Sequence, residues 1–142
     1  MKDFVVYHNP DSMGKDVRSV GALSIVTNKP VDEVKGDRVG LLTGEGVPRS
    51  YFLRSWFIID DVQTNVEGFK TKLSGEKGKV FEPMVELNRE EWFKDFKRSQ
   101  GNFSLGLQRI KDERFIRGLE SLAEARIITL KPFPSRAKKD TE

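Results

Sequence analysis

The stretch RSYFLRSWFII, residues 49–59, predicts a long β-strand with apolar residues on both faces. Alternate side chains of a strand point to opposite faces. One face then carries Tyr51, Leu53, Phe57 and Ile59. The other face carries Phe52, Arg54, Trp56 and Ile58. Arg54 is therefore expected between two aromatic rings, where it either contacts a ligand or packs its alkyl chain on Trp56 beneath a helix.

The length and composition of the chain indicate one folded domain. With 142 residues, of which 37% are hydrophobic and 33% charged, the chain is large enough for one core and too small for a second domain of ordinary size. We expect residues 1–130 to form that domain. Residues 131–142, KPFPSRAKKDTE, are predicted to be a basic, flexible tail.

The residue content excludes several classes of site. The chain has no cysteine and one histidine, His8, so disulfides, thiolate metal sites and multi-histidine sites are ruled out within one chain. We expect no metal and no other cofactor. No apolar run reaches the roughly 18 residues of a membrane span, and the first residues lack the apolar core of a signal peptide. We therefore expect a cytoplasmic protein without membrane contact. A net charge of +3 and a sequence pI of about 9.2 permit nucleic-acid binding without requiring it.

Strand signals come early in the chain and helix signals come late. Strands are predicted at residues 3–8, 22–28, 37–43, 49–59 and 80–87, with Pro83 at an edge or a bulge. Loops are predicted at residues 9–21 and 68–79. A capping box from Asn88 to Glu91 predicts a helix over 89–98. Asp112 as N-cap predicts a second helix that ends near residue 126, before a closing strand at 127–130. This order favours an α+β fold, a small curled antiparallel sheet or pseudo-barrel with the two helices packed beside it.

The segment KGDRV, residues 35–39, leads into the third predicted strand. Together with the element order across residues 1–130, it resembles the PUA-like superfamily, and within it EVE-type domains. Such domains often begin a barrel strand with a Gly-Asp turn. The resemblance implies a small pseudo-barrel that binds RNA or DNA, often around a modified base, without catalysis. Tyr7 takes the place of the first-strand aromatic residue, where a tryptophan is more typical of EVE domains.

The first group of candidate site residues lies on the long strand. Phe52, Arg54 and Trp56 share its second face in the predicted alternation, and Arg49 stands at its start. Bases stack on aromatic rings, and an arginine among the rings can contact phosphate or stack on a base. The structural alternative is that a late helix covers this face.

Two further groups lie in or beside loops. At the end of the first strand, a ring, an imidazole and an amide follow one another in Tyr7, His8 and Asn9. They can stack on a base and read its edge, or form a turn that satisfies its own backbone. After the first helix, polar groups stand beside an aromatic residue in Ser99, Gln100, Asn102 and Phe103. These residues can form a pocket wall, or an ordinary connection anchored by the phenylalanine.

Three functions fit these residues. The leading one is a non-catalytic module that binds DNA or RNA at a modified base or a single-stranded segment. The second is a protein-interaction or homodimer surface on the aromatic strand face, with a separate effector protein as a possible partner. The third is a metal-dependent nuclease, because Asp11, Glu33 and Lys35 match the loose pattern of such enzymes. That chemistry would need Glu33 and Lys35 on a central strand, whereas the sequence places them before one.

Overall fold

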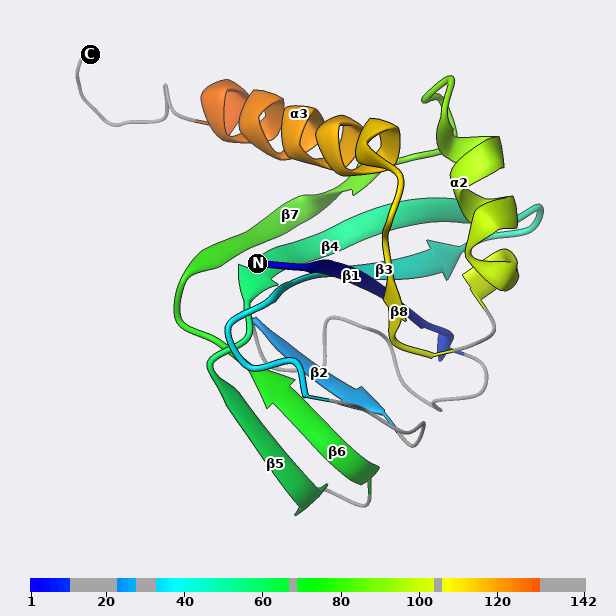
Figure 1. The fold of residues 1–142 in the computed structure, drawn as a ribbon. Coiled ribbons are helices and arrows are strands. Elements are labelled where there is room, and N and C mark those ends of the chain that lie inside the picture. The colour runs from blue at the N-terminus through cyan, green and yellow to red at the C-terminus, as the bar shows by residue number, and fades with distance from the viewer. Residues whose placement is uncertain (11–22, 28–32, 67–68, 104–105, 131–142) are drawn as a thin grey trace.

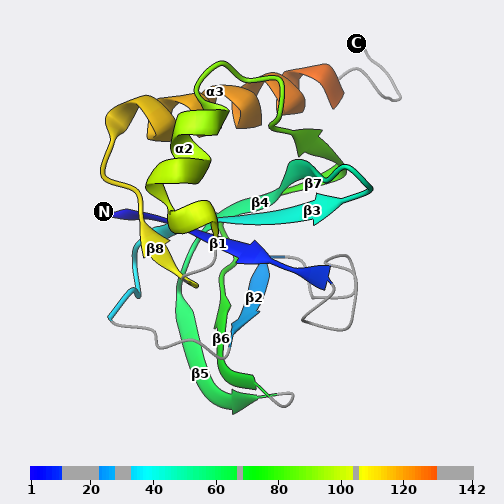
Figure 2. The same ribbon diagram turned by 90° about the vertical axis from the view of Figure 1, so that its right-hand side faces the viewer.

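In the computed structural model, which describes residues 1–10, 23–27, 33–66, 69–103 and 106–130, two β-sheets lie against one another (Figure 1). The five-stranded sheet has the order β7 (Gly78–Glu86), β4 (Ser50–Ile58), β3 (Arg38–Glu45), β1 (Asp3–His8) and β8 (Gln108–Arg109). The three-stranded sheet has the order β2 (Ser24–Thr27), β6 (Phe69–Ser74) and β5 (Asp61–Val66). The helices α2 (Phe93–Ser99) and α3 (Glu113–Leu130) cover the other face of the larger sheet, with the short 3₁₀ turn η2 (Gly101–Phe103) after α2 (Figure 2).

The fold class is α+β, as predicted, but the sheets are not antiparallel throughout. β1 and β3 pair in parallel, with Asp3 opposite Arg38 and His8 opposite Thr43. The remaining strand pairs are antiparallel. A parallel pair needs a long connection, and here the connecting chain contributes β2 to the other sheet. The described strands therefore form two facing sheets, and they do not close into the expected barrel.

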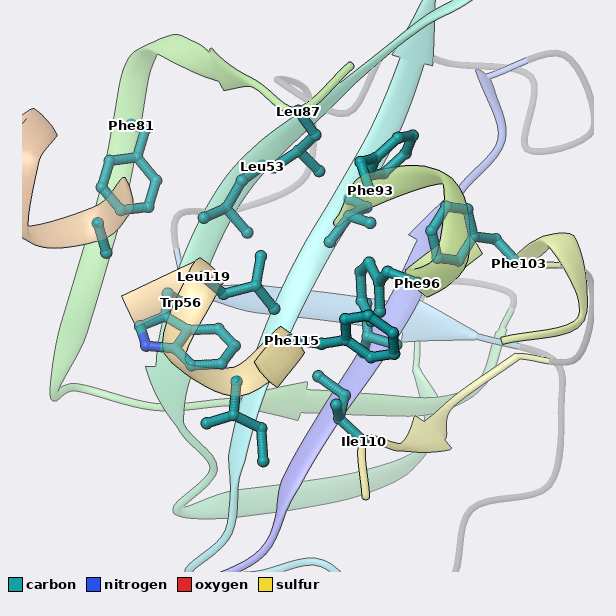
Figure 3. Close-up of a cluster of buried hydrophobic side chains, with 14 residues drawn as sticks. Leu53, Trp56, Phe81, Leu87, Phe93, Phe96, Phe103, Ile110, Phe115 and Leu119 are labelled. Atoms are coloured by element: carbon teal, nitrogen blue, oxygen red, sulfur yellow. The ribbon is translucent and has the colours of Figure 1, made fainter. Parts of the chain in front are cut away.

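Apolar side chains fill both faces of the five-stranded sheet. The helix-side cluster joins this sheet to α2, η2 and α3, and Figure 3 labels its members Leu53, Trp56, Phe81, Leu87, Phe93, Phe96, Phe103, Ile110, Phe115 and Leu119. The inter-sheet cluster contains Val6, Ile25, Val34, Val39, Leu41, Phe57, Ile59, Leu73 and Met84. Removing these side chains from water is the main favourable contribution to folding. β4 carries apolar residues on both faces because its sheet lies between the helices and the smaller sheet.

The segment KGDRV fixes β1 beside β3. The Asp37 carboxylate accepts a hydrogen bond from the Lys2 backbone N–H at 2.9 Å. Arg38 donates through Nε to Asp3 Oδ1 at 2.6 Å and through Nη2 to Glu120 Oε2 at 2.7 Å. Burial by itself lowers the pKa of Arg38, but the hydrogen bonds and charges of Asp3 and Glu120 outweigh burial and raise the pKa above its usual value. Arg38 therefore stays charged and links β1, β3 and α3.

Sequence patterns did not predict two strands of the smaller sheet, β5 and β6, or the short strand β8 of the larger one. β5 was not predicted, and β6 together with the start of β7 replaces the predicted loop at residues 68–79. Val62, Gln63 and Thr64 of β5 are exposed, so this strand lacks the alternation of apolar and polar residues that identifies a half-buried strand. β8 has two residues, too few for any periodic pattern.

The starts of the two helices depend on the hydrogen bonds that the side chains of Asn88 and Asp112 accept. Asn88 Oδ1 accepts the Tyr51 backbone N–H instead of capping a helix, and α2 begins only at Phe93. Asp112 caps α3 as predicted, because its Oδ1 accepts the Arg114 N–H at 2.9 Å. α3 continues to Leu130, so the predicted closing strand at 127–130 is wrong, and the strand propensity of IITL yields to the helix that precedes it. Among the described residues, no helix is both long and apolar enough to cross a membrane.

α3 lies very close to the turn before α2 at Gly118. A Cβ atom at this position would overlap the indole ring of Trp92. The same ring contacts Phe96 and Phe115, with 5.8 and 6.3 Å between ring centroids. Glycine in a helix interior costs about 1 kcal/mol relative to alanine. Its presence here is explained by the space that the indole ring needs.

We therefore expect Gly118→Ala to lower the free energy of unfolding by about 1–3 kcal/mol, the usual cost of overpacking, in spite of the better helix propensity of alanine. Urea unfolding followed by circular dichroism measures this change. Ser121→Ala, at an exposed position of the same helix, is the control and should be neutral or slightly stabilising. A Gly118→Ala protein as stable as the parent would contradict the close approach of Trp92.

Candidate functional site

A β-bulge at Arg54 divides the predicted aromatic–arginine face. Consecutive residues of β3 pair with Leu53 and Ser55, so Arg54 is an extra residue in β4. The extra residue shifts the alternation of side chains by one position. Leu53 and Trp56 consequently both belong to the helix-side cluster. Phe52 packs instead against the inter-sheet cluster. The prediction that Phe52, Arg54 and Trp56 share one face is therefore wrong.

The guanidinium of Arg54 holds the neighbouring edge strand in place. Its Nη1 donates to the Phe81 carbonyl oxygen and to Glu82 Oε1, each at 3.1 Å. β7 is displaced here, because the register between β4 and β7 shifts beside Arg54. Pro83 lies in the displaced segment of this edge strand, which confirms its predicted position. The Arg54 side chain is 13% exposed, so its polar groups are directed mainly at β7.

Trp56 is covered from above by α3. The residue is 6% exposed and packs in the helix-side cluster, where Figure 3 shows it beside Leu119. The Arg38 guanidinium carbon lies 4.5 Å from the centroid of its ring. Because Phe52 points to the opposite face, the described structure has no continuous aromatic strand face that could serve as a stacking platform or as a homodimer surface.

Two of the other predicted groups meet at the C-terminal end of α2. The rings of Tyr7 and Phe103 stack with 5.9 Å between centroids and 18° between planes. Tyr51 lies 5.7 Å from Tyr7 and 5.9 Å from Phe103. Arg49 Nη1 donates to Tyr7 Oη at 2.8 Å, and Lys97 Nζ lies 4.7 Å from the Tyr51 ring centroid. We call the half-buried residues Tyr7, Arg49, Tyr51 and Lys97 the tyrosine surface.

A glycine in β3 makes room for the tyrosine surface. A Cβ atom at Gly44 would overlap Tyr7 Oη and the alkyl chain of Arg49. Any larger residue would therefore displace both side chains from the end of the strand. Gly44, in the sequence TGEG before the turn into β4, therefore gives these two side chains the space that they occupy.

The remaining residues of the predicted groups are placed differently. His8 is buried, and strand alternation directs its side chain away from that of Tyr7. Its backbone oxygen accepts the Thr43 hydroxyl at 2.9 Å. Asn9 is half-buried directly after β1, and residues 11–21 of the predicted loop lie outside the described residues. Asn102 is exposed in η2 with a φ of 56°.

A groove lies at the end of α2, on the side away from the tyrosine surface. This groove, with a volume of about 720 Å³, runs between α2, β8 and the start of α3. Its charged lining consists of Arg98, Arg109, Lys111, Arg114, Asp95 and Asp112. Cations thus outnumber carboxylates by four to two. We call this hollow the basic groove.

The pairing of charges in the basic groove is incomplete. Arg98 and Arg114 both contact Asp95, with N–O distances of 3.4 and 3.5 Å. Arg109 and Lys111 have no carboxylate partner within the part of the chain that the structure describes. Two exposed cations are therefore available to an anionic ligand at the groove.

The backbone around Ile110 explains why these two cations are exposed. Ile110 is buried in the helix-side cluster, and its N–H donates to the Asp3 carbonyl oxygen at 2.7 Å. Arg109 pairs with Phe4 of β1. In an extended segment, the neighbours of a buried residue point away from it. Burial of Ile110 thus turns Arg109 and Lys111 outward.

Ser99 and Gln100, both predicted as site residues, line the basic groove. Ser99 Oγ donates to the Phe96 carbonyl oxygen at 2.8 Å, at the end of α2. The Gln100 N–H bonds to the carbonyl oxygens of Phe96 and Lys97, which fixes its backbone as the helix C-cap. The third predicted group is therefore divided, with Phe103 at the tyrosine surface and Ser99 and Gln100 at the groove.

The acidic residues of the nuclease pattern do not gather in the described part of the chain. Glu33 and Lys35 are exposed in the turn before β3, and Asp11 lies outside the described residues. Across those residues, His, Asp and Glu side chains form no group of three or more that could hold a metal ion.

Sequence reasoning missed several residues that form these surfaces. Tyr51 was assigned to a strand face but not to a site, and Lys97 and Arg98 were not among the predicted site residues. In the sequence, only the alternation of Arg109, Ile110 and Lys111 before the helix cap Asp112 could have indicated that the two cations are exposed. Such a short segment carries too little periodicity to establish which side chains are exposed.

The contacts of Arg54 lead to a stability prediction. Arg54→Ala should lower the free energy of unfolding by about 1–3 kcal/mol, because the Phe81 carbonyl oxygen loses a charged donor at the bulge. Chemical unfolding measures the loss, and Arg89→Ala, at an 87% exposed arginine, is the control that should change little. Unchanged stability in Arg54→Ala would contradict the view that Arg54 stabilises β7.

Comparisons of the chain with models of protein families, with curated proteins and with solved structures each found no match.

Proposed function

We propose that the protein is a non-catalytic nucleic-acid-binding module that binds a single-stranded segment or a modified base at the C-terminal end of α2. The observation that carries this proposal is the pair of exposed cations, Arg109 and Lys111, at the basic groove, neither of which has a carboxylate partner among the described residues. Exposed cations along a groove attract the phosphate groups of a nucleic acid and release its bound counterions.

The tyrosine surface supports the same ligand class. Tyr7 and Tyr51 are half-buried rings with Arg49 and Lys97 against them. Stacking of a base on an aromatic ring contributes about 1–3 kcal/mol, and it tolerates different bases. Lys97 contacts Tyr51 while the next residue, Arg98, lines the basic groove, so the last turn of α2 joins the two surfaces. A single-stranded nucleic acid that crosses this turn would contact cations on one side and aromatic rings on the other.

The resemblance of KGDRV and of the strands-then-helices order to PUA-like domains is a second, independent support. It implies the same ligand class, with a modified base as one form of the ligand. In this chain, the KGDRV segment holds β1 beside β3 through Asp37 and Arg38. The end of β1 in turn carries Tyr7, so the segment that resembles the family positions one wall of the tyrosine surface.

We expect the double substitution Arg109→Ala with Lys111→Ala to weaken binding of single-stranded oligonucleotides and to reduce its dependence on salt. Each phosphate contact on a single strand contributes about 0.7 to the slope of log K against log salt concentration, so loss of two contacts should make the slope shallower by about 1.4. Fluorescence anisotropy with modified and unmodified DNA and RNA oligonucleotides, over a series of salt concentrations, measures both effects.

The control for this experiment is Lys79→Ala with Arg89→Ala. It removes the same charge at exposed positions that do not line the basic groove. An equal loss of affinity in the control would show that net charge matters and the groove does not. Absence of salt-dependent binding to every DNA and RNA probe would overturn the proposed function.

A further inference from the structure

Gln100 is a buried amide with an unused acceptor. The residue is 5% exposed. Its Nε2 donates to Ser99 Oγ at 3.4 Å, but its Oε1 has no hydrogen-bond partner among the described residues. Leaving a buried acceptor unpaired costs about 1–3 kcal/mol, and such a group in a folded protein needs an explanation.

The position of Gln100 suggests that explanation. Two buried polar side-chain atoms lack a partner among the described residues: Ser55 Oγ lies at the bulge of β4, whereas Gln100 lines the basic groove. Phe115, which is 3% exposed, lines the same groove, so a small part of the groove wall is apolar. A ligand that relieves this acceptor must donate an N–H or O–H and fit against an apolar wall.

The cations at the edge of the groove restrict the ligand further. Arg109 and Lys111 are exposed and have no carboxylate partner in the described part of the chain, so they favour an anionic group on the same ligand that donates to the amide. A nucleotide with an exocyclic amino group combines both features, since its phosphate is anionic and its amino group donates a hydrogen bond. Adenine and cytosine carry this amino group where guanine, thymine and uracil carry an oxygen, and the amino group of guanine lies on the minor-groove edge of its ring.

We propose that Gln100 Oε1 accepts a hydrogen bond from the exocyclic amino group of adenine or cytosine, while Arg109 and Lys111 hold the adjoining phosphate; this assignment rests on the proposed function. The amide reaches the base by rotation about its terminal χ3 torsion, which is broad for glutamine. Its long contact with Ser99 is the one side-chain hydrogen bond that this rotation gives up. The cations then supply affinity that is independent of sequence, and Gln100 supplies discrimination between bases.

The test compares oligothymidylates of roughly 12 nucleotides, a length within the site size of single-strand binding proteins, that carry one central adenine, hypoxanthine, cytosine or thymine. Hypoxanthine has the size of adenine with an oxygen in place of the amino group. We expect the parent protein to prefer adenine over hypoxanthine about tenfold, the factor for one hydrogen bond to a buried acceptor. Gln100→Leu should lose this preference and keep the salt dependence of binding.

The controls separate the role of Gln100 from that of the groove. Gln108→Leu makes the same chemical change at a half-buried amide of the same groove, and it should keep the preference for adenine. Thermal unfolding of Gln100→Leu should show no loss of stability, since the substitution removes an unpaired oxygen. Gln100→Met, which keeps an unbranched side chain, replaces it in the binding assay if the leucine variant is unfolded.

The possible outcomes are distinct. Binding of all four oligonucleotides with equal affinity would overturn the role of Gln100 and leave the proposed function intact, as would an adenine preference that survives in Gln100→Leu. Loss of the preference in Gln108→Leu would also overturn the assignment to Gln100. Failure of the parent protein to bind any of the probes would overturn the proposed function itself.

Discussion

The arrangement of the larger sheet and of α3 depends on the guanidinium of Arg38. It bonds Asp3 of β1 and Glu120 of α3 and lies over the ring of Trp56 in β4. One charged group thus fixes the parallel pair at the centre of the larger sheet and the helix above it. A partly buried guanidinium is tolerated here because two carboxylates compensate its charge and a ring covers it. With α3 held in this position, Trp56 is 6% exposed, and only its edge lines the hollow of about 490 Å³ beside Arg38 and Glu120.

The bulge at Arg54 shows where sequence patterns reach their limit. The positions of β1, β3, β4 and β7 follow from residue type, because strand formers bounded by turn residues give a local signal. The face on which each side chain lies does not follow, because one extra residue reverses the alternation beyond it. A bulge is stabilised by partners from other strands, here the Phe81 carbonyl oxygen and Glu82. Those partners come from a strand far along the chain, so the segment 49–59 alone could not indicate the bulge.

The candidate site was predictable only in part, because residue type indicates candidate residues but not the surface on which they lie. Tyr7, Arg49 and Phe103 were selected by residue type from three separate segments, and the structure places them in contact. Ser99 and Gln100 were selected with Phe103 as one loop, yet the end of α2 directs them to a different surface. The contribution of β8 could not be foreseen, because two residues carry no periodic signal. The pairing of β8 with β1 and the burial of Ile110 are what expose Arg109 and Lys111.

The aromatic packing behind both surfaces gives them a rigid base. Phe96 lies 5.1 Å from Phe115 and 5.6 Å from Phe103 between ring centroids, so one ring of α2 contacts a wall of the basic groove and the ring behind the tyrosine surface. Rings packed in this way lose little further freedom when a ligand binds, which reduces the entropic cost of association. A rigid base also keeps the exposed cations and the buried amide at a fixed separation. Under the proposed function, selectivity for a base would depend on whether its amino group and its phosphate match that separation, which a flexible loop could not enforce.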